Sequence, residues 1–168
     1  MNKIAFLIML LPVLTVNAQK INQKMMDEKS GKEILLGYCN RDGFYTSAFD
    51  SSYQVNYQAY VTDKLVMEKL KSRMSDLTIT IVMGSWCGDS KEQVPRFYRI
   101  LDELSFDYTK LTLLCVDRTK KAGDIPMEDL KISLVPTFIF YRNAKEIGRI
   151  TETPEDTLEK DFLKILGD

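Results

Sequence analysis

The chain runs Thr78-Ile79-Thr80-Ile81-Val82-Met83-Gly84-Ser85-Trp86-Cys87-Gly88-Asp89-Ser90 through its middle, from an apolar stretch to a glycine, one cysteine and polar residues. The apolar half has the length and the β-branched content of a buried strand. Residues 91–104 carry a helical apolar pattern, so Cys87 falls on the turn from strand to helix. A helix N-terminus stabilises a thiolate and can lower the pKa of a cysteine from about 8.5 to between roughly 3.5 and 7.5. Cys87 is therefore the candidate reactive residue.

Three separated features resemble the thioredoxin family. Trp86-Cys87-Gly88-Asp89-Ser90 is similar to the active-site motif Trp-Cys-Gly-Pro-Cys, with Asp89 in place of the proline and Ser90 in place of the second cysteine. Val135-Pro136-Thr137 resembles the cis-proline loop that faces the active-site cysteine, and Pro95 matches a proline inside the following helix. The resemblance extends from about Tyr57 to the C-terminus. It implies an α/β, thioredoxin-like fold.

The expected elements follow the order of that fold. The apolar patterns predict helices over residues 57–74 and 91–104, strands over 77–84 and 110–117, a short helix over 126–130, a hairpin over 137–150 and a C-terminal helix from residue 154. We expect a mixed central sheet flanked by helices on both faces. Residues 57–168 then form the thioredoxin-like domain, and residues 19–56 form an N-terminal extension. The aromatic residues of the extension either pack onto the domain or form a substrate-contact surface.

The first 18 residues have the pattern of a signal peptide. Asn2-Lys3 is a basic start, residues 4–14 are almost wholly apolar, and Val16-Asn17-Ala18 offers a small-residue cleavage site. The apolar run is short for a membrane span, so we expect export without a membrane anchor after cleavage. In a Gram-negative bacterium the destination is the periplasm, where disulfides persist. The remaining 150 residues suit one domain.

Charge and composition narrow the function. The chain has 23 basic and 24 acidic residues, a net charge of −1, and no basic cluster dense enough to predict a nucleic-acid surface. The run Arg118-Thr119-Lys120-Lys121 is interpreted as a solvated loop face. The chain contains no histidine, which excludes a histidine-based hydrolase and a His/Cys zinc site. We expect no metal and no cofactor.

The motif predicts monothiol chemistry. A Cys87 thiolate can attack a disulfide and form a mixed disulfide, but the Ser90 hydroxyl cannot resolve it. Three outcomes stay open: resolution by an external thiol, shuffling in which the substrate's own thiol expels Cys87, and a covalent hold on a partner cysteine. Ser90 either donates a hydrogen bond to the thiolate or caps the helix.

Neighbouring charges modulate this thiol in opposite directions. The Asp89 carboxylate disfavours the thiolate, and Lys91 favours it. We therefore expect half-maximal alkylation of Cys87 at about pH 7 to 8. Thioredoxins also carry a buried aspartate six residues before the first motif cysteine, and here that position is Ile81. The usual proton shuttle of dithiol reduction is therefore not expected.

The resemblance also implies substrate contacts. In the family the cis-proline loop pairs with a bound peptide as an added strand, so Val135, Pro136 and Thr137 are carried over as substrate-binding residues. Trp86, by the same resemblance, shields the thiol and contacts the partner; the alternative is an ordinary core aromatic residue. The expected partners are protein or small-molecule thiols and disulfides.

The other two cysteines have less defined roles. Cys115 lies between Leu114 and Val116 in an apolar strand and is expected to act as a small packing residue. Cys39 is free, bonded to Cys115, or a resolving partner for Cys87, and its spacing does not choose among these.

Two function classes follow. The first is an exported thioredoxin-like protein that performs thiol–disulfide exchange through Cys87, as a monothiol reductase or isomerase. The second is a non-catalytic module that binds a peptide or a partner protein at the proline loop. A peroxiredoxin-like peroxidase is less favoured, because Gly84 stands where that family has a threonine three residues before its reactive cysteine.

Overall fold

A computed structural model describes residues 20–45 and 49–167, so the expected signal peptide lies outside the described residues. Its centre is a six-stranded sheet in the order β1-β2-β4-β3-β5-β6. The strands are β1 (Gln23–Asp27), β2 (Lys32–Cys39), β3 (Leu77–Met83), β4 (Leu111–Cys115), β5 (Thr137–Arg142) and β6 (Lys145–Thr151). Only β3 and β4 are parallel, and every other neighbouring pair is antiparallel. The sheet is therefore mixed, as predicted.

Strand β3 lies inside the sheet, and its alternating side chains enter two separate clusters. Ile79, Ile81 and Met83 join the larger apolar core, whereas Val82 belongs to a smaller cluster with Leu114. Successive side chains of a strand point to opposite faces, so the two clusters lie on the two faces of the sheet. Both faces are covered at the end of β3, where Ile81, Val82 and Met83 are buried, whereas Thr78 near its start is exposed.

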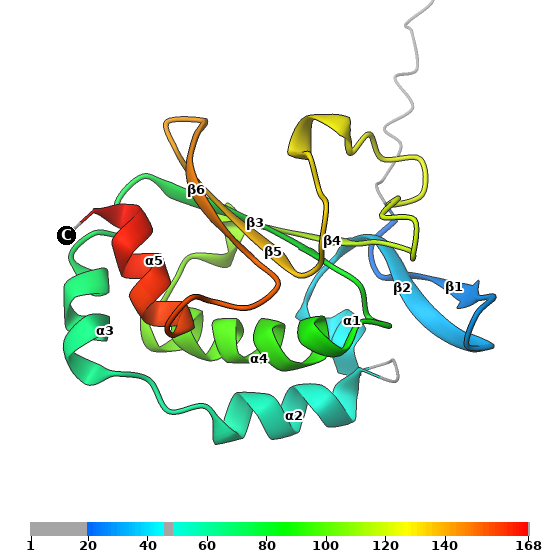
Figure 1. Cartoon of the computed structure of the whole chain (residues 1–168), viewed down its shortest axis with the longest axis horizontal. Helices are drawn as coiled ribbons and strands as arrows, with labels where there is room; N and C mark the ends of the chain where they lie inside the picture. The colour runs from blue at the N-terminus through cyan, green and yellow to red at the C-terminus, as the bar shows by residue number, and fades with distance from the viewer. Residues whose placement is uncertain (1–19, 46–48, 168) are drawn as a thin grey trace, which may run out of the picture.

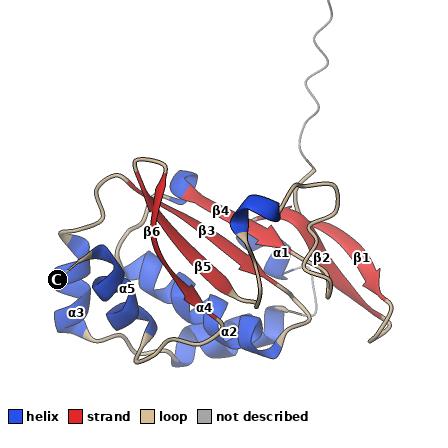
Figure 2. Cartoon of the chain, turned by 45° about the horizontal axis from the view of Figure 1, so that its top comes forward, coloured by secondary structure: helices blue, strands red, loops and turns tan. Residues whose placement is uncertain are grey.

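All five α-helices contribute to the larger core. They are α1 (Arg41–Tyr45), α2 (Asp50–Ala59), α3 (Lys64–Lys71), α4 (Gly88–Glu103) and α5 (Leu158–Leu166). Figure 1 shows them below the sheet, and Figure 2 shows the same layer behind the strands. The long helix α4 lies against the middle of the sheet, with α2 packed outside it.

The opposite face of the sheet is covered by a thinner layer, in which the expected helix is reduced to a single turn. It is covered by residues 116–136, whose helical part is the single 3₁₀ turn η2 (Glu128–Leu130). Gly123 has a left-handed φ of 68°, and Lys131 ends η2 with a left-handed φ of 51°. These two positions, with Pro126 between them, prevent a longer helix from forming.

The predicted helix over residues 57–74 is two helices. Helix α2 ends at Ala59 and α3 begins at Lys64, with an extended link between them. The Asp63 side chain accepts hydrogen bonds from the backbone N–H groups of Leu65 and Val66 and so caps α3. Sequence periodicity continued through this cap, which is why the break was missed.

Part of the N-terminal segment belongs to the central sheet. Strand β2 pairs with β4, and β1 pairs with β2 at the edge of the sheet. Phe44, Phe49 and Tyr53 are at most 2% exposed, and the Phe44 ring lies 5.6 Å from that of Tyr98 on α4. This agrees with the packing alternative for these aromatic residues. The predicted start of the domain at residue 57 lies within α2.

A carboxylate on α4 ties this segment to the helix layer. Asp102 forms an ion pair of 3.0 Å with Arg41 and accepts hydrogen bonds from the hydroxyls of Tyr57 and Tyr108 at 2.7 and 2.6 Å. Burial raises the pKa of Asp102, but the hydrogen bonds from Arg41, Tyr108 and Tyr57 outweigh it, so the pKa is lowered. The folded state therefore holds the ionised form of this carboxyl more firmly than the unfolded chain does.

This carboxylate predicts a loss of stability in acid. The stabilisation is present above the unfolded pKa of about 3.9, and it is lost as the pH falls through the lower folded value. Urea unfolding from pH 7 down to pH 2 should show a shallower acid slope of the unfolding free energy in Asp102→Asn than in the wild type. Asp124→Asn, at an exposed carboxyl, is the control. Parallel slopes in all three proteins would contradict the prediction.

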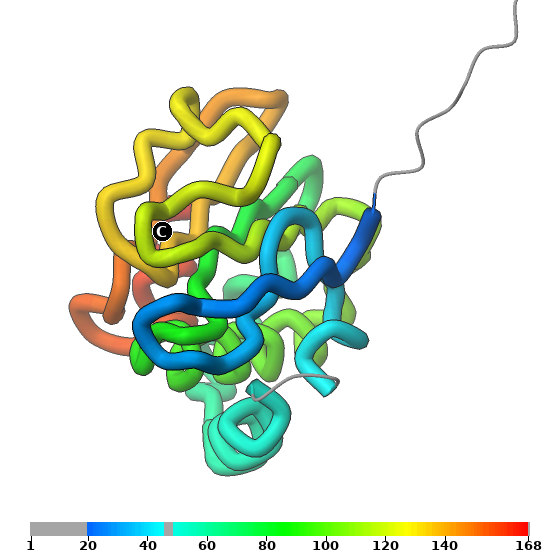
Figure 3. The backbone as a smooth tube through the Cα atoms, turned by 90° about the vertical axis from the view of Figure 1, so that its right-hand side faces the viewer, coloured from blue at the N-terminus to red at the C-terminus, as the bar shows by residue number. Residues whose placement is uncertain are grey.

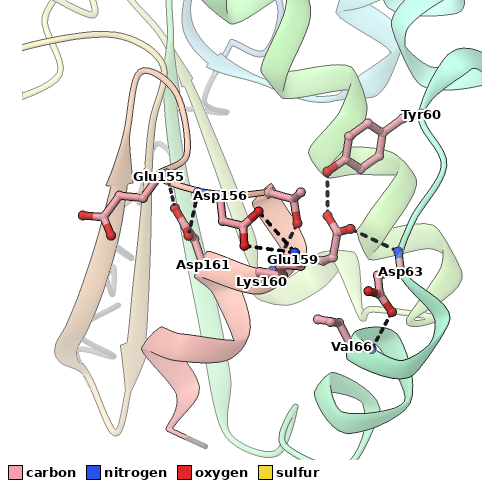
Figure 4. A network of polar contacts seen from close by, with 9 residues as sticks. Tyr60, Asp63, Val66, Glu155, Asp156, Glu159, Lys160 and Asp161 are labelled. Atoms are coloured by element: carbon pink, nitrogen blue, oxygen red, sulfur yellow. Dashed lines mark hydrogen bonds and ion pairs between the residues drawn. The ribbon is translucent and has the colours of Figure 1, made fainter.

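A buried carboxylate on α5 fixes the link between α2 and α3. Glu159 is 2% exposed and accepts hydrogen bonds from the Tyr60 hydroxyl at 2.6 Å and from the backbone N–H of Asp63 at 3.1 Å. Figure 4 shows Glu159 pointing between these two groups. One side chain thus holds both the extended link and the capping residue of α3.

Removing this carboxylate should destabilise the fold. Glu159→Ala leaves the half-buried Tyr60 hydroxyl and the Asp63 backbone N–H without their partner, so we expect a loss of about 2 kcal/mol in the free energy of unfolding, measured by urea denaturation. Glu155→Ala should cost far less, because it removes only an exposed ion pair with Lys164 of α5. Equal losses for the two variants would show that the Glu159 contacts do not stabilise the link.

Candidate active site

Cys87 occupies the N-cap of α4, at the end of the turn that follows β3. Its backbone N–H donates to the Gly84 carbonyl at 2.9 Å, and its own carbonyl accepts from the Lys91 N–H at 3.1 Å. The predicted position between strand and helix is confirmed. The side chain is partly exposed and makes no capping hydrogen bond, so the sulfur is directed away from the helix backbone.

The sulfur faces the proline loop. Cys87 Sγ lies 3.2 Å from the carbonyl oxygen of Val135, which accepts a hydrogen bond from the thiol, and the Val135–Pro136 peptide is cis. Asp89 Oδ2 lies 3.9 Å from the same sulfur. Residues 48 positions apart in the sequence are therefore brought into contact, and both of these acceptors of the thiol are oxygens.

The three loop residues are themselves buried, unlike the one before them. The Pro136 carbonyl accepts from the Glu152 N–H at 2.7 Å, and the Thr137 hydroxyl donates to the Leu134 carbonyl at 2.7 Å. Thr137 is 1% and Val135 is 4% exposed, whereas Leu134 is 44% exposed. Leu134 is thus the accessible apolar side chain of the loop. Sequence reasoning missed it, because the motif match begins one residue later.

Ser90 has a different hydrogen bond from either one predicted. It is fully buried, and its Oγ accepts from the backbone N–H of Gly84 at 3.2 Å. Among the described residues no hydrogen bond joins it to Cys87, and the N-cap of α4 is Cys87 itself. Ser90 therefore ties the first turn of α4 to the end of β3.

Ser85 makes a second such tie and was not anticipated. It is 8% exposed, and its Oγ accepts from the backbone N–H of Leu35 on β2 at 2.9 Å. A serine inside an otherwise apolar loop was the available signal. The turn before Cys87 is therefore held at two points, by the bond of the Ser85 hydroxyl to β2 and by that of the Ser90 hydroxyl to Gly84.

Trp86 is fixed by contacts on two sides of its ring. The indole Nε1 donates to the Val116 carbonyl at 2.9 Å, and the Arg118 guanidinium carbon lies 4.7 Å from the ring centroid. A Cβ at Gly84 would come within 2.6 Å of the indole, so only glycine permits this close packing. Trp86 is half-buried and lies directly before the reactive residue.

Arg118 is not the solvated residue that its sequence context suggested. It forms a two-pronged ion pair with Asp27 of β1, with Nε–Oδ1 and Nη2–Oδ2 distances of 2.9 Å. Hydrogen bonds from Arg118 and Ser30 hold the pKa of Asp27 well below its usual range. Lys91, the other predicted modulator, makes no ion pair within the described part of the chain.

The three cysteines are free and lie in two separate places. Cys39 and Cys115 belong to the core beneath the helices, whereas Cys87 packs against the cluster on the opposite face of the sheet. Burial and the neighbouring Cys39 raise the pKa of Cys115. Cys39 also lines a cavity of about 300 Å³ with Tyr98 and Tyr108. This geometry does not bring Cys39 to Cys87 as a resolving partner.

Neither a metal site nor a membrane span is found in the described residues. No group of three His, Cys, Asp or Glu side chains there could hold a metal ion. None of their helices has both the length and the apolar character needed to cross a bilayer.

The position of Ser90 predicts a structural effect rather than a chemical one. Ser90→Ala leaves the buried Gly84 N–H without its acceptor, so we expect a loss of about 1 to 2 kcal/mol in unfolding free energy by urea denaturation. The pH at half-maximal alkylation of Cys87 should stay within about 0.3 units of the wild type, because no bond joins the two side chains. A clear rise in that pH would instead indicate a Ser90 hydrogen bond to the thiolate.

Comparisons with known proteins agree with this geometry. Residues 58–164 match the family model for thioredoxin. Thioredoxin H2-1 from Oryza sativa subsp. japonica is 31% identical over 84 residues, which cover 50% of this chain and 56% of that protein. The TPR repeat-containing thioredoxin TDX of Arabidopsis thaliana is 29% identical over 92 residues, which cover 55% of this chain and 23% of that protein. The match thus spans about half or less of the length of these two relatives.

A solved structure supports the fold. A crystal structure of a Pseudomonas aeruginosa protein of unknown function superposes with a TM-score of 0.50 and 14% sequence identity, covering 71% of this chain and 80% of that one. The family model covers more than half of the chain and includes both Cys87 and the proline loop. The chain belongs to the thioredoxin family.

Proposed function

We propose that this protein is an exported thioredoxin-like protein that performs thiol–disulfide exchange through Cys87. The observation that carries the proposal is the partly exposed Cys87 sulfur at the N-cap of α4, 3.2 Å from the Val135 carbonyl of the cis-proline loop. A helix N-terminus favours the thiolate, which is the attacking form in disulfide exchange. Membership of the thioredoxin family supports the same chemistry.

The exchange balances as a simple displacement. The Cys87 thiolate attacks one sulfur of a disulfide, a new sulfur–sulfur bond forms, and the other sulfur leaves as a thiolate that takes up a proton from water. The thiol proton, which is hydrogen-bonded to the Val135 carbonyl, must leave Cys87 before the attack. Trp86 directly precedes Cys87 in the turn, and the exposed Leu134 directly precedes Val135 in the loop, so each is an apolar residue next to a contact point of the sulfur.

Resolution of the adduct requires a thiol from outside the site. Ser90 is buried and hydrogen-bonded to Gly84, and Cys39 and Cys115 lie on the opposite face of the sheet. The mixed disulfide is therefore cleaved by an external small thiol or by a second thiol of the substrate. The first route makes the protein a monothiol reductase, and the second makes it an isomerase. Without either thiol, Cys87 holds its partner covalently.

The proposed location follows from the first 18 residues. Their basic, apolar and small-residue segments form a signal for export, and the periplasm of a Gram-negative bacterium supplies protein disulfides as substrates. The proposed partners are thus exported proteins with disulfides and small thiols of the same compartment. No membrane attachment is proposed after cleavage.

Mass spectrometry with glutathione disulfide tests the exchange. The mature wild type should gain one glutathione adduct on Cys87, because that sulfur is the accessible one, and Cys87→Ser should gain none there. Cys115→Ser, which removes a fully buried thiol, is the matched control and should behave as the wild type. Isomerisation of a scrambled disulfide protein, followed by recovered activity, should be lost only in Cys87→Ser.

Failure has a defined meaning in this experiment. A wild type that forms no adduct and does not differ from Cys87→Ser would favour the non-catalytic binding module. Ser90→Cys adds a second thiol to the motif, and a gain of insulin reduction by this variant would show that only the resolving thiol is missing.

A further inference from the structure

An ion pair connects the N-terminal hairpin to Arg118, the loop residue that packs on Trp86. Asp27 ends β1 and is 5% exposed, yet its carboxylate is engaged on both oxygens by Arg118, 91 positions later in the chain. Ser30 donates its backbone N–H to the same carboxylate. Figure 3 shows the β1–β2 hairpin lying beside the segment that follows β4, which carries Arg118. The family model begins at residue 58, so Asp27 lies outside the matched region.

The guanidinium held in this way packs on the active-site turn. The central carbon of the Arg118 guanidinium is 4.7 Å from the centroid of the Trp86 ring. The indole N–H of the same ring donates to the Val116 carbonyl. A guanidinium stacked on an indole is attracted by the ring, and its planar fork matches a carboxylate at the same time. Asp27, Arg118 and Trp86 therefore form one continuous series of contacts that ends next to Cys87.

Arg118 also brings a positive charge to this turn, because its guanidinium packs on Trp86, the residue directly before Cys87. A cation close to a cysteine favours the thiolate over the thiol. Of the other groups near Cys87, Asp89 on α4 is negative at 3.9 Å, the Val135 carbonyl is an oxygen at 3.2 Å, and Lys91 makes no ion pair among the described residues.

Two carboxylates, Asp27 and Asp117, are charged groups next to Arg118, and both already have hydrogen-bond partners. Asp27 neutralises part of the guanidinium charge, and Asp117 is bonded within its own loop to the backbone N–H groups of Thr119 and Lys121. The cation that packs on the turn itself is thus Arg118. Its position depends on a carboxylate supplied by the hairpin.

We propose that Arg118 is a positioning residue for the Cys87 thiol, and that Asp27 of the N-terminal hairpin holds it in place over Trp86. Arg118 fixes the Trp86 ring against the turn and supplies the positive charge that offsets the Asp89 and Val135 oxygens when Cys87 ionises. The hairpin is then part of the reactive site rather than only an edge of the sheet. This inference deepens the proposed function and rests on it for its role in exchange.

Two measurements made without a disulfide substrate test the inference. Cys87 alkylation by iodoacetamide, followed by the mass of the peptide that contains it, gives the pH at half-maximal reaction. Acrylamide quenching of fluorescence reports on Trp86 alone, because it is the only tryptophan of the chain. Neither readout requires exchange activity, so a failure of the proposed exchange and a failure of this inference are told apart.

Arg118→Gln is the principal variant. We expect the pH at half-maximal alkylation to rise by about half a unit or more, because the cation is lost and Asp27 is left without its charge partner. Acrylamide quenching of Trp86 should increase. Lys121→Gln removes the same charge from an exposed position of the same loop and should change neither readout. Unchanged readouts in Arg118→Gln, or equal shifts in Lys121→Gln, would overturn the proposal.

The double variant Asp27→Asn/Arg118→Gln separates charge from position. Removing the orphaned carboxylate should lower the alkylation pH relative to Arg118→Gln, while quenching of Trp86 stays high. If Arg118→Gln does not fold, Arg118→Lys decides, because it keeps the charge but loses the fork and the stacked plane. Increased quenching in Arg118→Lys supports the positioning role, and wild-type quenching overturns it.

Discussion

The position of β3 is the constraint on which the site depends. This strand is hydrogen-bonded to β4 on one side and to β5 on the other, and its side chains are packed on both faces. Its end is then held by the Val116 N–H, which donates to the Met83 carbonyl, and by Ser90, which binds the Gly84 N–H. The turn that carries Cys87 therefore starts from a point that is hydrogen-bonded on both sides. This fixed start places the sulfur within hydrogen-bonding distance of the Val135 carbonyl.

The sequence predicted the elements whose signals are local. A β-branched run followed by glycine and a helical pattern indicated β3, the turn and α4, and the match of two distant motifs predicted that Cys87 would face Val135 and Pro136. The fold class followed from the same match. The break between α2 and α3 was missed although Asp63 gave a local capping signal, because the apolar spacing continued past it.

Other features could not be predicted because their partners are distant in sequence and carry no pattern. Arg118 stands in a run of basic residues, and nothing in that run shows that a buried carboxylate 91 positions away will bind it. Ser90 occupies the place of a second cysteine and was expected either to bond to the thiolate or to cap the helix, yet it is buried and its hydroxyl accepts from the Gly84 N–H instead. In both cases the expected role was based on neighbours in the sequence, whereas the contacts of the residue are made with residues that are close only in the fold.

The distribution of thiols gives the monothiol interpretation a physical basis beyond the motif. The sheet separates Cys87 from Cys39 and Cys115, which belong to the cluster on its other face, so an internal disulfide with either one would require this part of the fold to open. The central pairs of a sheet are among the last to open in a folded domain. Any partner for the Cys87 sulfur must therefore arrive from solvent. The hairpin that holds Arg118 is connected to the same turn through the contact of the guanidinium with Trp86, which places the N-terminal strands where they can influence the thiol.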